Sequence, residues 1–387
     1  MTNKIIYYVG NFDRPEFNAA GKRVYGNALI LSKLDYKVVL IGKSTNEIGN
    51  PTVNYGDNIV FLKFPNYAIY KSGKYLNFVI DTITKFGKPE FIIRYGSPGL
   101  AEFDRQLLIF CKRIGIKLIA DVVDWLSPSG DSFIFNSIKR IDTYLEKGVF
   151  NAESDGVIAI SSYLSHYYTE KNCNTVIIPP LVAEYKENNS YNVNINLVYA
   201  GVPFRLNRKV KNNDEVKDRL DLAVHGIAGV IKRGLAIVFD IYGITKEQYL
   251  MAYPNDSDLI NNAIRFHGKQ SMQIVQEHIN KADFTILLRD RNRASMAGFP
   301  TKIVESVSCG TPVITTDTSD ITRYITNNKT GFIIDVSNEK NMINEFERIL
   351  CVDREQLQSM KRNCFEGRDF SPENYQSTMQ DFLESVL

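Results

Sequence analysis

The stretch of sequence that decides the fold runs from residue 297 to residue 314 and reads AGFPTKIVESVSCGTPVI. Its spacing predicts a glycine-containing loop, a short helix over Thr301–Cys309, a turn at Gly310 and then a buried strand. Free backbone N–H groups and the helix dipole favour an anion at the start of such a helix. Glu305 lies within two turns of that start, where its carboxylate could accept hydrogen bonds from a ribose diol. The same spacing is also that of an ordinary loop and helix in an α/β sheet, with Glu305 solvated.

On both sides of this stretch, short apolar runs alternate with longer amphipathic segments, which favours parallel sheets covered by helices on both faces. In the first half we expect strands at 5–9, 37–41, 59–64, 91–94, 117–122, 156–160 and 176–178, and helices at 20–34, 75–86, 100–114, 133–150 and 162–170. In the second half we expect strands at 196–199, 236–242, 264–266, 284–288, 312–315 and 331–334, and helices at 216–231, 245–252, 272–280, 301–309, 321–326, 339–350, 354–363 and 372–386.

The two series of elements predict an α/β protein with two doubly wound, Rossmann-like domains facing a central cleft. We expect an N-terminal domain over 1–184, a polar linker over 185–194, a C-terminal domain over 195–370 and a last helix over 371–387 that packs back on the first domain. In open α/β sheets, ligands bind outside the carboxyl ends of the strands. Dehydrogenases, epimerases and binding proteins share this outline, so the fold alone does not determine a function. A G-x-G-x-x-G motif is absent after the first strand, which argues against a nicotinamide cofactor.

Composition excludes several classes of protein. Of the 387 residues, 44% are hydrophobic and 23% charged, with a net charge of +2, which is typical of a soluble globular protein and gives no argument for nucleic-acid binding. The five cysteines have neither metal nor disulfide spacing and predict reduced thiols in a cytoplasmic protein. No leader and no apolar run near the ~20 residues of a membrane span is visible. A slight excess of Lys and Arg in the first 180 residues is compatible with peripheral attachment of that domain to the inner face of a membrane, although a solvated surface is the simpler interpretation.

The 297–314 stretch resembles the signature of retaining glycosyltransferases of the GT-B fold, family 4 in particular, which runs E-G-F-G-x-P-x-x-E-A-x-x-x-G-x-P-V. The positions in register are Gly298, Phe299, Glu305, Gly310, Pro312 and Val313. The chain departs from the signature at Ala297, where the family has the first Glu of its pair, and at Pro300 and Lys302, where the family has Gly and Pro. The resemblance covers most of residues 1–350 and is specific only around 298–313.

For the second half, the resemblance implies a donor site. Family members clamp the donor pyrophosphate with an Arg and a Lys that lie between the first strand of this domain and the next helix. Here Gly201 ends the strand, Lys217 matches the Lys just inside the expected helix, and Arg205 matches the Arg, with Arg208 as the alternative in a loop that is longer than the family's. A solvated run of charges is the other interpretation of this loop.

Residues around the signature complete the implied donor site. Arg289 emerges from the strand 284–288 and could reach the diphosphate or a carboxylated sugar. The resemblance implies that Gly298, Phe299, Pro300 and Thr301 hold the donor and that Glu305 binds its ribose.

In the first half, Gly10 follows the first strand and Gly21 opens the first helix. They resemble the glycine-containing loop of GT-B transferases that lies beside the donor phosphates and the acceptor; a plain strand-to-helix connection is the alternative. Asp124 follows the strand 117–122, where family members often have His, and could orient a hydroxyl of the acceptor or the donor. Its alternatives are a helix cap and a surface ion pair. Trp125, the next residue, could stack on a sugar ring.

The function that follows is retaining, hexosyltransferase-type transfer from a nucleoside diphosphate sugar, a UDP-sugar first, to an acceptor hydroxyl. The resemblance implies a role in surface polysaccharide or glycan synthesis, with a glycan, lipid-linked or protein-linked acceptor. The strand-end loops hold no Asp-x-Asp motif, so we expect fixed cations rather than a metal to stabilise the leaving diphosphate, and no further cofactor. A GT-B sugar-nucleotide epimerase and, because of Ala297, a non-catalytic partner subunit are the alternatives.

Overall fold

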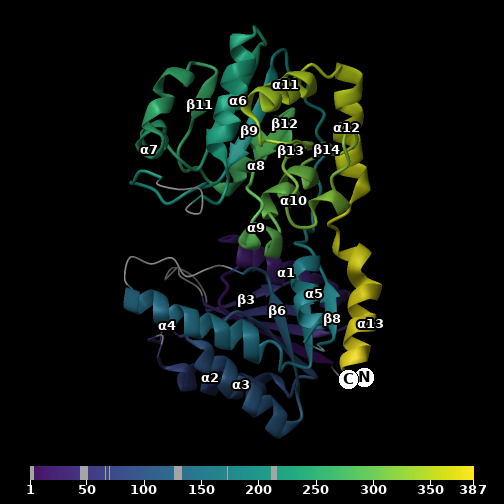
Figure 1. Cartoon of the computed structure of the whole chain (residues 1–387). Helices are drawn as coiled ribbons and strands as arrows, with labels where there is room; N and C mark the ends of the chain where they lie inside the picture. The colour runs from purple at the N-terminus through teal and green to yellow at the C-terminus, as the bar shows by residue number, and fades with distance from the viewer. Residues whose placement is uncertain are drawn as a thin grey trace. The chain divides into compact units, whose positions relative to one another are not determined.

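The computed structural model describes residues 4–43, 51–65, 67–68, 70–125, 133–171, 173–210 and 216–387 (Figure 1). The chain divides into two compact units. The first unit comprises residues 1–183, 297–299 and 370–387, and the second comprises residues 184–296 and 300–369. Each unit is described by itself below.

The first unit contains a sheet with the strand order β3-β4-β2-β1-β5-β6-β7-β8. Its strands are β1 Ile5–Gly10, β2 Lys37–Gly42, β3 Thr52–Tyr55, β4 Ile59–Lys63, β5 Phe91–Tyr95, β6 Lys117–Val122, β7 Gly156–Ala159 and β8 Thr175–Ile177. The strand pairs are parallel, apart from the antiparallel pair of β3 and β4. Burial on both faces explains the unbroken apolar runs of strands such as β1, which is buried along its whole length.

Helices cover both faces of this sheet. They are α1 Ala19–Lys33, α2 Ser72–Phe86, α3 Ala101–Ile114, α4 Phe133–Thr143, the π-helical η1 Tyr144–Phe150, α5 Ser162–Thr169, the short η5 Pro372–Tyr375 and α13 Gln376–Val386. Alternate residues of β1 point to opposite faces, as the period of a strand requires. Ile6 and Tyr8 pack with α1 and α13, whereas Tyr7 and Val9 pack with α2 and α3.

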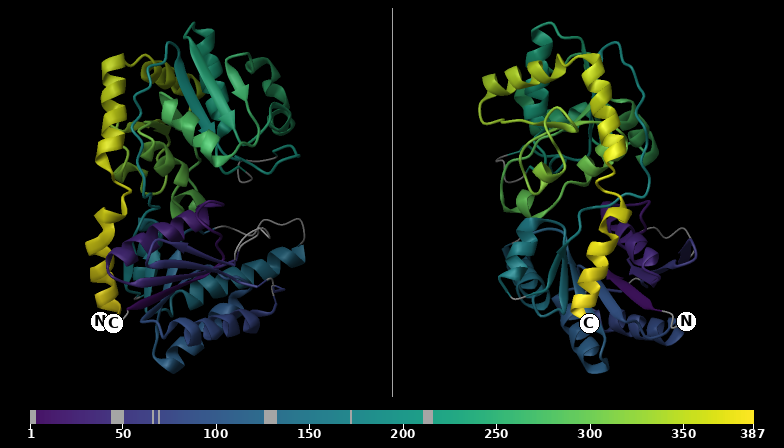
Figure 2. Two further views of the ribbon diagram at one scale, coloured as in Figure 1. Left: turned by 180° about the vertical axis from the view of Figure 1, so that it is seen from behind. Right: turned by 90° about the vertical axis from the view of Figure 1, so that its right-hand side faces the viewer.

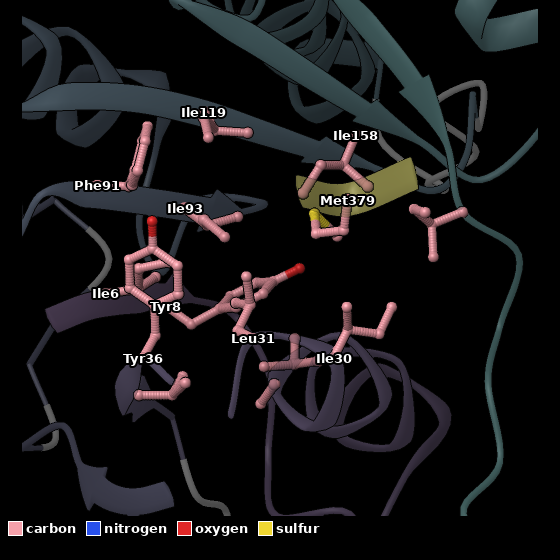
Figure 3. Packing of buried hydrophobic residues seen from close by; sticks show 14 of the residues in the cluster. Ile6, Tyr8, Ile30, Leu31, Tyr36, Phe91, Ile93, Ile119, Ile158 and Met379 are labelled. Carbon is pink, nitrogen blue, oxygen red and sulfur yellow. The ribbon is translucent and has the colours of Figure 1, made fainter. Parts of the chain in front are cut away.

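The C-terminal helix belongs to the core of the first unit. Met379, Phe382, Leu383 and Val386 of α13 are buried in the same cluster as Ile6 and Tyr8. Figure 3 shows Met379 beside Ile158 and close to Ile93 in this cluster. Both views of Figure 2 show α13, in yellow, lying along the first unit's sheet. The chain therefore enters the second unit after residue 183 and returns at residue 370.

The second unit contains a sheet with the strand order β11-β10-β9-β12-β13-β14, in which the strand pairs are parallel. The strands are β9 Ile195–Ala200, β10 Ile237–Tyr242, β11 Ile264–Phe266, β12 Phe284–Leu287, β13 Val313–Thr315 and β14 Gly331–Ile333. The helices are α6 Leu220–Lys232, α7 Lys246–Ala252, η3 Pro254–Leu259, α8 Met272–Lys281, α9 Arg293–Ala297, α10 Thr301–Ser308, η4 Ile321–Arg323, α11 Glu339–Leu350 and α12 Arg354–Gly367.

The predicted α/β class and the doubly wound sheets are confirmed, and several local predictions need correction. Strand β3 and helix α9 were not expected, because each is short and lacks a clear apolar period. The helix expected over 216–231 begins only at Leu220, because Val216 pairs with Phe204 in an antiparallel bridge and Lys217 N donates to Pro203 O. The helix expected over 133–150 changes to a π-helix at Tyr144.

The strand orders place one reversal of winding in each sheet. In the first unit, the parallel strands run outward in chain order in both directions from the pair β1 and β5, with the antiparallel β3 at the edge; in the second unit the strands do so from β9 and β12. Ligands of open α/β sheets bind at the carboxyl ends of such strand pairs. Among the described residues, no helix is long and apolar enough to cross a membrane.

Candidate active site

The first unit has a cavity of about 530 Å³ at the carboxyl ends of β1, β5 and β6, which includes the reversal point of its sheet. The ends of these strands and the loops after them contribute Asn11, Tyr95, Ser97, Asp121 and Asp124. The opposite wall comes from α4 and η1 and contains Lys139, Asp142, Glu146 and Lys147. Hydroxyl, carboxylate and ammonium groups therefore converge on a space that holds a ligand of sugar size.

A buried network holds Asp121 in the floor of this cavity. Oδ1 of Asp121 accepts a hydrogen bond of 3.0 Å from Arg23, and its Oδ2 accepts one from the hydroxyl of Tyr8. Asn27 donates to the same tyrosine hydroxyl over 2.9 Å. Since the ion pair with Arg23 is fully buried, this carboxylate is a fixed part of the scaffold.

Asp124, which the sequence predicts to be catalytic, lines the same cavity and is less enclosed. Its carboxylate pairs with the ammonium of Lys147, which also donates to the Asp124 carbonyl. Trp125 packs edge-on against Tyr167, with 4.4 Å between ring centroids. Part of the indole ring is therefore already in contact with the protein itself. Sequence reasoning missed Lys147, because 23 positions and a change of helix type separate it from Asp124.

Gly10 and Gly21, predicted to lie beside the donor, have a packing reason for lacking a side chain. A Cβ on Gly10 would collide with the backbone of Tyr95, and a Cβ on Gly21 would collide with the carbonyls of Asp13 and Arg14. The cavity is lined by their neighbours Asn11 and Ala20.

In the second unit, charged side chains gather at the carboxyl ends of β9 and β12. Asp218 is completely buried, and its Oδ1 accepts a 2.8 Å hydrogen bond from Nε of Arg289. Its Oδ2 accepts hydrogen bonds from the hydroxyl of Tyr199 and from the ammonium of Lys302. The ammonium of Lys302 lies against Gly201, where a Cβ would collide with it. We call Tyr199, Asp218, Arg289 and Lys302 the Asp218 cluster.

The environment of the Asp218 cluster fixes its charges. Burial alone would raise the pKa of Asp218, but Lys302 and Arg289 outweigh burial and hold that pKa far below its usual range. Burial lowers the pKa of Lys302, the Asp218 carboxylate opposes this shift, and Arg289 and Lys217 add to it. The cluster thus carries one stable negative charge and two positive charges, largely shielded from water.

Lys217 and Arg205, the two residues predicted as phosphate clamps, lie between Tyr199 and Asp218 in the sequence. Phe204 and Val216 form an antiparallel bridge, and Lys217 follows Val216 directly. The side chain of Lys217 is exposed, and its charge lowers the pKa of Lys302. Lys217 therefore lies three residues before α6, not inside the helix as expected. Arg205 is exposed and directly follows Phe204, the other residue of this bridge.

Arg219 and Arg291 line a second hollow of about 830 Å³, at the ends of β12, β13 and β14. Arg219 donates to Asp290 over 2.9 and 3.0 Å and also pairs with Asp221. Arg291 pairs with Asp317 over 3.1 Å. Of the three arginines in this hollow, Arg289 alone also belongs to the Asp218 cluster.

The signature stretch forms the helix α10 as expected. Pro300 is its N-cap, Thr301 its first residue, and half-buried Glu305 lies in its second turn. Residues 297–299 are grouped with the first unit, where the carbonyl of buried Ala297 accepts a 2.6 Å hydrogen bond from Ser161 and the ring of Phe299 packs against Phe370. The structure thus brings Gly201, Arg289 and Lys217 to one edge of the second sheet and adds Asp218 and Lys302, which the sequence did not single out.

A metal site is not evident in the part of the chain that is described: no three His, Cys, Asp or Glu side chains there are grouped to hold an ion.

Comparisons with known proteins relate part of the chain to a family. Residues 187–366 match the family model of the glycosyl transferases group 1. No curated protein sequence matches the chain.

Solved structures match over nearly the whole length. Sucrose-phosphate synthase from Thermosynechococcus elongatus is 12% identical with a TM-score of 0.72, covering 99% of each chain. Anabaena HepE in complex with UDP and glucose is 12% identical with a TM-score of 0.64, covering 99% of this chain and 100% of that one. The pneumococcal O-GlcNAc transferase GtfA, in complex with UDP and GlcNAc, is 10% identical with a TM-score of 0.64, covering 100% and 99%. Residues 187–366 therefore match the glycosyl transferases group 1 family, and the chain as a whole has the GT-B fold of these solved structures.

Proposed function

We propose that this protein transfers a sugar from a nucleoside diphosphate sugar, with UDP as the nucleotide, to an acceptor hydroxyl, and that the anomeric configuration is retained. The observation that carries the proposal is the position of Arg289 and Gly201 at the carboxyl ends of β12 and β9, where the second sheet reverses its winding. Two structures of similar fold hold UDP, which supports UDP as the donor nucleotide.

The donor binds to the second unit in this account. Its diphosphate faces Arg289, with Lys217 and Arg205 at the base of the neighbouring loop, and the N-terminus of α10 at Thr301 adds the positive end of a helix dipole. Glu305, one turn further along α10, accepts hydrogen bonds from the ribose hydroxyls. Gly298, Phe299 and Pro300 form the loop that precedes this helix.

The acceptor binds to the first unit, in the cavity that Asp121 and Asp124 line. Asp124 is the more exposed of these two carboxylates and orients the acceptor hydroxyl, while Lys147 holds Asp124 in place. A polar cavity of this volume accommodates a sugar residue of a glycan, or the terminal sugar of a lipid-linked or protein-linked acceptor, as expected in surface polysaccharide or glycan synthesis.

The reaction breaks the bond between the anomeric carbon and the β-phosphate oxygen, and the electron pair stays on that oxygen. The acceptor hydroxyl forms the new bond on the same face of the sugar, and its proton passes to the departing phosphate. Fixed cations stabilise the negative charge that develops on the diphosphate, so this mechanism requires neither a protein nucleophile nor a divalent metal.

A panel of UDP-, GDP-, ADP- and TDP-sugars, each incubated with the protein and with oligosaccharide or membrane-extract acceptors, tests the proposal. We expect a glycosylated product, or slow hydrolysis of the donor, with at least one UDP-sugar. Conversion of a donor into its epimer would identify a GT-B epimerase instead. Binding of none of the donors at millimolar concentration would favour a non-catalytic partner subunit, in line with Ala297.

A further inference from the structure

Lys302 stands where the family signature has proline, and its ammonium lies at the carboxyl edge of the second sheet, over the ring of Tyr199 at 4.6 Å. We propose that Lys302 is a donor-binding residue that contacts the diphosphate together with Arg289, and that Asp218 and Tyr199 are positioning residues that aim both cations. This inference rests on the proposed function and names a residue that carries it.

The geometry shows that Lys302 is held in one place. Its ammonium donates to Asp218 and, over 3.1 Å, to the hydroxyl of Tyr199, which itself donates to Asp218 over 2.8 Å. An ammonium has three N–H donors. Among the described residues, no third partner lies within hydrogen-bond distance of it, and 22% of the side chain remains exposed. One N–H donor of the fixed ammonium is therefore left without a protein partner, and we propose that the ligand takes it.

Arg289 has the complementary arrangement. Its Nε is occupied by Asp218, its backbone N–H donates to Thr316 over 2.9 Å, and only 9% of its side chain is exposed. Within the described chain, its terminal nitrogens have no hydrogen-bond partner, so two parallel donors remain for a phosphate. Guanidinium groups bind phosphate through such pairs of donors.

Positive charges outnumber negative charges in and beside the Asp218 cluster. Asp218 supplies one negative charge, whereas Lys302 and Arg289 supply two positive charges, and Lys217 contributes a further one nearby. Buried like charges repel strongly unless a counter-charge compensates them. The absence of a Cβ at Gly201 makes room for the ammonium at the edge of the sheet, next to the backbone that a diphosphate would approach.

Calorimetry with the full-length protein tests the proposal, with UDP and uridine as two separate probes. We expect Lys302→Met to weaken UDP binding about tenfold or more, because a hydrogen bond between charged groups is lost. Uridine, which lacks phosphates, should bind the variant as it binds the wild type, and Lys302→Arg should restore part of the UDP affinity. Lys281→Met is the matched control, since Lys281 is an exposed lysine at the opposite edge of the sheet, before β12.

The outcomes separate the two proposals. If the wild type binds UDP and Lys302→Met binds it equally well, Lys302 is not a ligand and the inference is wrong, while the proposed function stands. Equal losses for UDP and uridine would show that Lys302 has only a structural role. If the wild type binds no nucleoside diphosphate, the proposed function itself fails.

A second readout needs no variant. NMR titration of the Lys302 ammonium in the wild type should show its pKa rising when UDP is added and remaining unchanged with uridine, because a nearby anion favours the charged form. An equal pKa with and without UDP would overturn the proposal.

Discussion

The Nε atom of Arg289 lies 2.8 Å from Oδ1 of Asp218, although 71 positions separate the two residues in the chain. This contact joins the end of β12 to the segment before α6, across the point where the second sheet reverses its winding. In the donor site proposed above, the Asp218 carboxylate orients the two cations and does not itself contact the ligand.

Asp218→Asn should therefore destabilise the second unit at neutral pH by about 3–5 kcal/mol, the usual effect of removing one partner from a buried ion pair. The pKa of Asp218 lies below that of the unfolded chain, so its contribution is present above the unfolded value near 4 and is lost as the pH falls below it. Denaturant unfolding between pH 3 and pH 7 measures this, with exposed Asp258→Asn as the control. Equal stability of Asp218→Asn and wild type at pH 7 would contradict the account of the Asp218 cluster.

The alkaline limb of UDP binding should reveal Lys302. Its pKa lies below the ordinary 10.5, so its charge, and the affinity that depends on it, is lost as the pH rises through that lowered value. The groups facing it are Asp218, Arg289, Lys217 and Tyr199; burial and then Asp218 raise the pKa of Tyr199 well above 10, so the tyrosine stays protonated. In Lys302→Arg the decline should move to higher pH, since arginine keeps its charge. Superimposable pH profiles of the wild type and Lys302→Arg would show that the alkaline decline in UDP affinity does not come from Lys302.

Glu305→Ala should weaken UDP binding by about 1.5–3 kcal/mol, the scale of hydrogen bonds to a charged group. The loss should disappear with 2′,3′-dideoxy-UDP, because that ligand lacks the hydroxyls that Glu305 binds. Glu277→Ala, an exposed glutamate of α8, serves as the control. A loss of the same size for both nucleotides would remove Glu305 from the ribose site.

Asp124→Asn should lower turnover at least ~10-fold while UDP binding stays unchanged, because Asp124 lines the acceptor cavity of the first unit and orients a reacting hydroxyl. Initial rates at varied acceptor concentration, together with UDP calorimetry, check this. Asp381→Asn changes an exposed aspartate of α13 and should have no effect. Wild-type rates in Asp124→Asn would show that another group orients the acceptor.

The fold could be predicted closely because its strands are buried runs and its helices have clear apolar periods. What the sequence could not show are contacts between residues far apart, such as Arg289 with Asp218 or Lys147 with Asp124. The start of α6 was misplaced because helical spacing continues through Val216, whereas in the structure that residue pairs with Phe204.

Lys302 was visible only as a departure from the family signature. One signal for it did exist: the helix dipole disfavours a positive charge at the second position of a helix, so a lysine there favours a nearby carboxylate partner. The carboxylate proved to be Asp218, adjacent in sequence to the predicted Lys217. Local chemistry could therefore be inferred, while its partners required the tertiary structure.

The most direct test of the central claim is the anomeric configuration of the product. The protein is incubated with a UDP-sugar of known configuration and an acceptor in the presence of EDTA, and ¹H NMR follows the anomeric protons before the product can equilibrate. We predict a new glycosidic signal with the configuration of the donor, released together with UDP and formed at the same rate with and without the chelator. A product of inverted configuration, or transfer that EDTA abolishes and Mn²⁺ restores, would contradict the mechanism proposed here.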